Sequence, residues 1–118
     1  MTPLERLRLR TDIASVDAEG AREFAHREAR GLLLLPGDPT RPEVIDLAVV
    51  VSELHQRHPD LRIAIADSGH EAVLRERLHV TSFPSLVFVK DGAVAKVLSR
   101  MQSWATYLDA LASLEASS

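Results

Sequence analysis

Four consecutive leucines, Leu32–Leu35, stand between Gly31 and Pro36. A run that is this short and this apolar, with a glycine before it and a proline after it, is typical of a strand covered on both of its faces. This segment therefore predicts a central sheet with helices packed on both sides.

The apolar pattern along the rest of the chain predicts the other elements. Asp91-Gly92 lies between two β-rich runs and is a typical hairpin turn. Strands are predicted over 12–16, 32–35, 61–66, 85–89 and 93–98, and helices over 17–29, 42–57, 68–78 and 103–114. Asp17 is a candidate N-cap of the helix over 17–29. The order β-α-β-α-β-α-β-β-α calls for parallel strands joined by right-handed crossovers, with an antiparallel strand added by the hairpin.

Length and charge limit the functions that the chain can serve. The chain has 118 residues and no repeat or linker divides it, so we expect one domain over residues 1–118. Its 14 basic and 17 acidic side chains give a net charge of −3. Binding to nucleic acid is not expected, because contact with a phosphate backbone needs a basic face. The longest apolar run, Leu47–Val51, is much shorter than the roughly 18 residues of a membrane-spanning helix, so no membrane insertion is expected.

The N-terminal segment carries three arginines, Arg6, Arg8 and Arg10, but no apolar stretch follows them. This pattern does not predict a secretory signal, and we expect a cytoplasmic protein. Residues 1–11 are interpreted as a flexible, solvated arm. The alternative interpretation is that the arginines bind an acidic partner.

The absence of cysteine excludes disulfides, thiol nucleophiles and cysteine-ligated metal centres. His55 and His58 have a helical spacing that suits one metal ion, but no third ligand is identifiable, and neither a metal nor another cofactor is expected. The residues Asp67–His70 include the types found in a hydrolytic triad. Neighbours within one turn do not adopt the geometry that nucleophile, base and orienting acid require, so we interpret this set as coincidence.

The dipeptide Phe83-Pro84 stands directly before the strand that enters the hairpin. Together with the order of elements, it resembles the thioredoxin fold over about residues 12–114. The resemblance implies a three-layer α/β sandwich with a cis peptide bond at Pro84, facing the redox motif of thioredoxins. That Cys-x-x-Cys motif would fall at about Arg41–Val44, where this chain has no sulfur, so thiol–disulfide exchange is excluded. Leu35 or a neighbour takes the place of the acid that thioredoxins bury.

Four segments, taken in order, carry a narrower resemblance. They are 42–44 with Asp46, 64–67, 83–88, and 97–98 with Trp104. They are similar to segments of the HupG/HyaE hydrogenase expression proteins, which are cysteine-free and thioredoxin-like. The resemblance implies a chaperone or accessory protein, not an enzyme, in the maturation of uptake nickel–iron hydrogenases. As partner it implies the small-subunit precursor, bound through its twin-arginine signal peptide before export, and it also allows other hydrogenase maturation proteins.

The acidic residues Glu43 and Asp46 lie in the first turns of the predicted helix over 42–57. They either complement the helix dipole or face the arginine pair of a signal peptide, with Phe83 expected to supply exposed apolar area beside them. Asp67 either binds a ligand at the end of its strand or caps the next helix. The candidate partner-binding residues are therefore Glu43, Asp46, Asp67, Phe83, Pro84 and Arg41.

Two other functions stay open. The first is a cysteine-independent enzyme of the thioredoxin fold, such as a glutathione-dependent transferase that uses the Pro84 platform. No pair of residues that would activate a nucleophile is recognisable, which argues against it. The second is a structural adaptor in another complex. Trp104 is either a core residue or, if it is exposed, a binding anchor.

Overall fold

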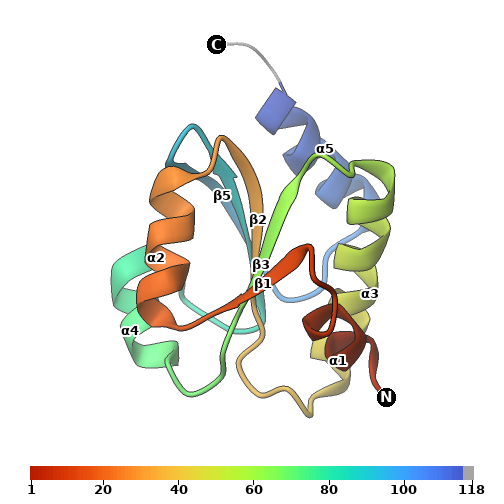
Figure 1. Ribbon diagram of the computed structural model, residues 1–118, viewed down its shortest axis with the longest axis vertical. Coiled ribbons are helices and arrows are strands. Elements are labelled where there is room, and N and C mark those ends of the chain that lie inside the picture. Colours follow the sequence, from red (N-terminus) through yellow and green to blue (C-terminus); the bar gives the residue numbers. More distant parts are fainter. Residues whose placement is uncertain (116–118) are drawn as a thin grey trace.

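The structure is a computed structural model that describes residues 1–115. Its elements, shown in Figure 1, are α1 (Pro3–Arg8), β1 (Ile13–Val16), α2 (Ala18–Arg27), β2 (Arg30–Leu35), α3 (Pro42–Arg57), β3 (Arg62–Ala66), α4 (Glu71–Leu78), β4 (Ser85–Lys90), β5 (Ala93–Ser99) and α5 (Trp104–Glu115). All of the predicted strands and helices are present, and α1 is an additional element. None of the helices in this range has the length and hydropathy of a membrane-spanning segment.

One mixed sheet runs through the described part of the chain, in the order β1-β3-β2-β4-β5. β1, β3 and β2 are parallel, and β4 pairs antiparallel with both β2 and β5. Figure 1 shows α1, α3 and α5 on one face of the sheet and α2 and α4 on the other. The predicted three-layer α/β arrangement is confirmed.

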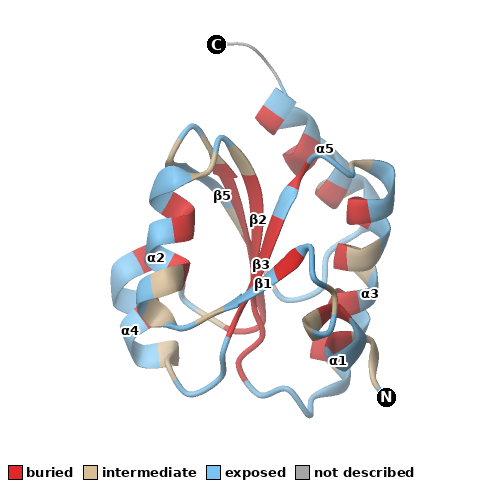
Figure 2. Cartoon of the chain, viewed as in Figure 1, coloured by how far each residue is buried: buried red, intermediate tan, exposed pale blue. Residues whose placement is uncertain are grey.

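The leucine run forms the centre of the sheet, as β2. All four of its side chains are fully buried, and Figure 2 shows the buried middle strands in red. Leu32 and Leu34 belong to the core beneath α1, α3 and α5, whereas Leu33 and Leu35 belong to the core beneath α2 and α4. Because both faces of β2 are covered, both sets of alternating positions are apolar.

The N-terminal segment is not the flexible arm that the sequence predicts. The Thr2 hydroxyl accepts a hydrogen bond from the Glu5 N–H, and the Glu5 carboxylate accepts one from the Thr2 N–H, each at 3.2 Å. This capping box starts α1. Leu4 and Leu7, three residues apart, are then buried in the core. The arginines between and after them give the segment the composition of a solvated tail, but the leucine pair fixes its position.

The helices α2 and α4, on the face of the sheet opposite α1, α3 and α5, begin in different ways. Asp17 caps α2 as predicted, since its carboxylate accepts a hydrogen bond of 2.8 Å from the Gly20 N–H. α4 begins at Glu71 rather than at Ser68, because Gly69 has a φ of +96°, outside the helical range. Asp67 therefore does not cap α4.

Candidate functional site

The candidate site is made of the loops at one end of the sheet. β2, β3 and β5 end there and β4 begins there, because β4 is antiparallel to both of its neighbours. The segments 36–41, 67–70, 81–84 and 100–103 are therefore neighbours, and we call them the site loops. They lie at the lower end of the sheet in Figure 1. The carboxyl ends of parallel strands are where open α/β sheets bind ligands.

Phe83 lies where three of the site loops meet. Its peptide bond to Pro84 is cis, as the resemblance implies. Gly37 has a φ of +68°, and a Cβ at Gly37 would lie 2.7 Å from Phe83 Cβ. The Ser68 hydroxyl donates a hydrogen bond of 2.8 Å to the Gly37 carbonyl. The guanidinium of Arg75 on α4 lies 5.3 Å from the Phe83 ring centroid, a cation–π distance.

Phe83 and Pro84 are buried, which corrects one prediction. Phe83 retains 9% of its exposed surface because Gly37 packs directly against it, so it does not offer open apolar area beside the acidic residues. The Pro84 carbonyl accepts a hydrogen bond of 2.8 Å from the Arg100 N–H. Both residues are therefore packed under the site loops and do not form part of their exposed surface.

Glu43, in the first turn of α3, is held by the chain itself. Its carboxylate oxygens lie 3.0 and 3.1 Å from Arg100 Nε, and the Met101 N–H donates to one of them at 3.3 Å. Arg41 lies farther away, at 3.9 Å. Burial raises the pKa of Glu43, but the Met101 N–H and the two guanidinium groups outweigh burial, and the pKa lies below its ordinary value. Glu43 therefore joins α3 to the loop after β5.

The remaining predicted residues differ in how far a partner can reach them. Asp46 is exposed on α3 and forms no ion pair with any residue that the structure describes. Arg41 is exposed at the N-cap of α3 and makes no capping hydrogen bond through its side chain. Asp67 is half exposed, and its carboxylate lies 3.5 Å from the guanidinium of Arg8, which also donates to the Ala66 carbonyl at 3.0 Å. Asp67 thus ties the end of β3 to α1.

The two histidines that have a metal-compatible spacing face different groups. His55 Nε2 lies 3.7 Å from an Asp12 carboxylate oxygen, and His58 Nδ1 lies 3.6 Å from Glu115. Among residues 1–115, no group of three side chains suited to a metal ion is present.

Several residues of the site are absent from the predicted set. Gly37 belongs to a Pro-Gly pair, which is a recognisable signal for a positive φ. No local pattern marks Arg100 as a site residue, because it reaches α3 only through the antiparallel pairing of β5 with β4. The same holds for Tyr107, which is buried and accepts a hydrogen bond of 2.9 Å from the Gln102 N–H. Burial, reinforced by the charge of Glu43, raises the pKa of Tyr107.

Replacement of Gly37 by alanine is expected to destabilise the protein by about 2–4 kcal/mol. About 1–2 kcal/mol comes from a side chain at positive φ, and the rest from crowding against Phe83. Gly69→Ala is the matched control, because φ at Gly69 is also positive but nothing lies within 4 Å of its Cβ position. Urea denaturation measures both free energies of unfolding. Equal losses for the two variants would show that Gly37 is not packed on Phe83.

The Glu43 ion pair is expected to make stability depend on pH in acid. The pKa of Glu43 is lower in the folded chain than its ordinary value of 4.5, so its contribution is complete above that value and is lost as the pH falls through the folded pKa. A Glu43→Gln variant lacks this contribution. The difference in urea midpoint between wild type and variant should therefore be present at pH 7 and shrink below about pH 4.5. A difference that is constant across this range would contradict the ion pair.

The fold and the site define a class of protein: a thioredoxin fold whose redox position holds no thiol. Spinach chloroplast thioredoxin f (short form) superposes with a TM-score of 0.72 at 13% identity, covering 89% of this chain and 95% of that one. Desulfothioredoxin from Desulfovibrio vulgaris Hildenborough in its reduced form gives a TM-score of 0.68 at 20% identity, covering 89% and 99%. At these identities the likeness shows the fold.

The sequence shows the family. Residues 4–107 match the family model described as hydrogenase-1 expression protein HyaE, and the chain belongs to this family. The hydrogenase expression/formation protein HoxO of Cupriavidus necator is 36% identical over 109 residues, which cover 89% of this chain and 68% of that protein. HoxO of Azotobacter vinelandii is 33% identical, covering 90% and 72%. The hydrogenase expression/formation protein HupG of Bradyrhizobium diazoefficiens is 38% identical, covering 73% and 60%.

Proposed function

We propose that this chain is a redox-inactive accessory protein in the maturation of an uptake nickel–iron hydrogenase, and that it binds the twin-arginine signal peptide of the small-subunit precursor. The observation that carries the proposal is that this chain belongs to a family of hydrogenase expression proteins and has a thioredoxin fold without cysteine. Without a thiol the site loops keep the arrangement of the thioredoxin fold but cannot perform thiol–disulfide exchange. We place this binding in the cytoplasm, because the precursor carries its signal peptide before export. We assign the chain no enzymatic step.

The charges of the site support this partner. Carboxylates pair with guanidinium groups through strong, often bidentate hydrogen bonds. Asp46 is exposed and forms no ion pair within the described residues, so its carboxylate is free for an arginine of the partner. Glu43 is already engaged by Arg100. In the proposal Asp46 contacts the partner, Asp67 lies at the margin of the contact, and Glu43 positions the first turn of α3.

The test is affinity capture with the full-length chain from cells that produce the hydrogenase, with the captured proteins identified by mass spectrometry. Recovery of the uncleaved small-subunit precursor, and not of the exported subunit, is the expected result. Recovery of a different stable assembly would support a structural adaptor instead, and recovery of other maturation proteins together with the precursor would extend the partner set.

A second assay separates the proposal from an enzymatic role. In an insulin-turbidity assay with dithiothreitol, the chain is expected to add nothing to the background rate of the reductant, because it has no thiol. Assays of glutathione transfer to standard acceptors should likewise give no turnover. Turnover above background in either assay would contradict an accessory role without chemistry.

A further inference from the structure

An exposed apolar patch lies on α5 and the loop before it. It consists of Met101, Trp104 and Leu108, each of which keeps 37% of its surface exposed. Trp104 and Leu108 are four residues apart, so their side chains lie on the same side of α5. Clustered exposed apolar side chains that include a tryptophan are typical of an interaction surface. We call these three residues the α5 patch.

The α5 patch borders α3 along its length. At one end the Met101 N–H donates to Glu43, in the first turn of α3. At the other end the guanidinium of Arg57, at the end of α3, lies 5.3 Å from the Trp104 ring centroid. Positions 43, 46, 50, 53 and 57 follow the helical repeat, so they line the same side of α3.

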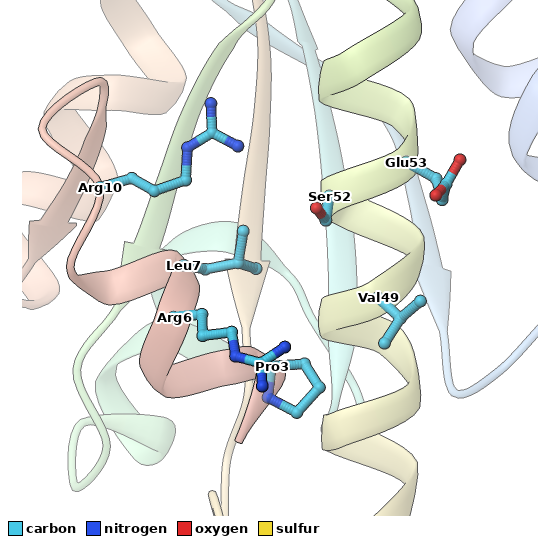
Figure 3. Close-up of a pocket in the computed structure, with 7 residues that line it drawn as sticks. All are labelled: Pro3, Arg6, Leu7, Arg10, Val49, Ser52 and Glu53. Atoms are coloured by element: carbon cyan, nitrogen blue, oxygen red, sulfur yellow. The ribbon is translucent and has the colours of Figure 1, made fainter. Parts of the chain in front are cut away.

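Beside the α5 patch lie two carboxylates without an ion pair and one cation without an ion pair. Arg100 is paired with the Glu43 carboxylate, whereas Arg57 lies on the Trp104 ring, has no carboxylate partner within residues 1–115 and keeps its positive charge. Asp46 and Glu53 are exposed and form no ion pair with residues 1–115. In Figure 3 the Glu53 side chain is directed away from α1, although Glu53 is also one of the residues that line the groove between α1 and α3. An apolar surface with free carboxylates beside it is complementary to a segment that is both cationic and apolar.

We infer that the α5 patch and the carboxylates of Asp46 and Glu53 together form the docking surface for the signal peptide. The arginine pair lies on the carboxylates of α3, and the apolar stretch that follows the pair covers Trp104 and Leu108. This inference rests on the proposed function, and it moves the apolar part of the contact from Phe83 to α5.

Two other arrangements fit the charges less well. The groove between α1 and α3 in Figure 3 has a volume of about 360 Å³ and is lined by Leu7 and Val49, by Arg6 and Arg10, and by Glu53. Arg10 is paired with Asp12 at 2.8 Å, whereas Arg6 forms no ion pair within residues 1–115 and would repel an arginine pair. A second copy of this chain, docked patch to patch about a twofold axis, would bring the Asp46 and Glu53 carboxylates of both copies to one interface.

The single tryptophan of the chain makes the surface directly observable. A synthetic peptide with two adjacent arginines and an apolar stretch, free of tryptophan and tyrosine, is titrated into the full chain. Covering the α5 patch should shift the Trp104 emission to shorter wavelength, and isothermal calorimetry should report the same Kd. Binding in the calorimeter without any change in Trp104 emission would place the peptide elsewhere and overturn the inference.

A variant pair provides the second test. Trp104→Ala combined with Leu108→Ala is expected to weaken peptide binding at least tenfold in the calorimeter. Val73→Ala is the matched control, because Val73 is equally exposed, at 39%, but lies on α4 on the opposite face of the sheet, and it should leave the Kd within twofold. Circular dichroism establishes that both variants are folded.

The outcomes separate this inference from the proposed function. No binding of the peptide to wild type by either method would contradict the signal-peptide proposal itself. Binding that is unchanged in the double variant would leave that proposal standing and remove the α5 patch from it. Sedimentation that shows a wild-type dimer and a monomeric double variant would assign the α5 patch to a second copy of the chain and overturn the inference.

Discussion

Replacement of Phe83 by alanine is expected to destabilise the protein by about 3–4 kcal/mol. The ring is almost fully buried, and it supports Gly37 on one loop and Arg75 on α4, so its removal leaves a cavity where three site loops meet. For a domain of 118 residues this loss corresponds to a fall in Tm of roughly 10–15 °C. Urea denaturation and thermal unfolding measure the two quantities.

Two further variants test the reason for that loss. Phe83→Leu keeps most of the apolar volume and should cost less than about 1.5 kcal/mol. Val73→Ala truncates a side chain that is already exposed and should change stability by no more than about 0.5 kcal/mol. A loss below about 1 kcal/mol for Phe83→Ala would show that the site loops do not depend on this ring.

Reversal of the charge at Asp46 is expected to weaken binding of a labelled signal peptide at least tenfold. A charge-assisted hydrogen bond is worth roughly 1.5–3 kcal/mol in good geometry, and about 1.4 kcal/mol corresponds to a tenfold change in Kd. In Asp46→Lys the attraction is replaced by repulsion of the peptide arginines. Asp46 has no partner within the described residues, so the fold should tolerate this change.

The control for Asp46→Lys changes the net charge by the same amount at a distant site. Glu76→Lys lies on α4, on the opposite face of the sheet, and Glu76 is exposed and free of ion pairs within residues 1–115. It should leave the Kd within twofold. Added salt should weaken wild-type binding and narrow the gap to Asp46→Lys, because exposed charges are screened. Equal affinities for Asp46→Lys and wild type would move the binding surface away from α3.

Patterns that depend on near neighbours in the sequence predict the fold well. The leucine run of β2 is buried on both faces as its composition predicts, and Asp17 caps α2 through the expected hydrogen bond. The cis bond at Pro84 follows from the resemblance to thioredoxins rather than from the residues alone. The prediction of a flexible arm over 1–11 is wrong, because a capping box and two buried leucines stabilise α1 although the segment is rich in arginine.

Contacts between distant segments limit what the sequence predicts about the site. From the sequence, Glu43 is expected to be an unpaired acid at the start of a helix. In the structure Arg100, which follows β5, forms an ion pair with it. Asp67 has the position of a helix cap, but α1 supplies Arg8 as its partner. The exposure of Trp104 depends on where α5 lies on the sheet beside α3, which no local pattern encodes. The acidic residues of the site are therefore predictable from the sequence, whereas their partners Arg100 and Arg8 are not.

Signal-peptide recognition is tested by the Kd of this chain for the hydrogenase small-subunit precursor with and without its signal peptide, measured by isothermal calorimetry at low salt. We expect binding of the complete precursor and at least tenfold weaker binding once the signal peptide is removed or its two arginines are replaced by glutamine. Equal affinities for the complete and the truncated precursor, or no binding of either, would contradict signal-peptide recognition.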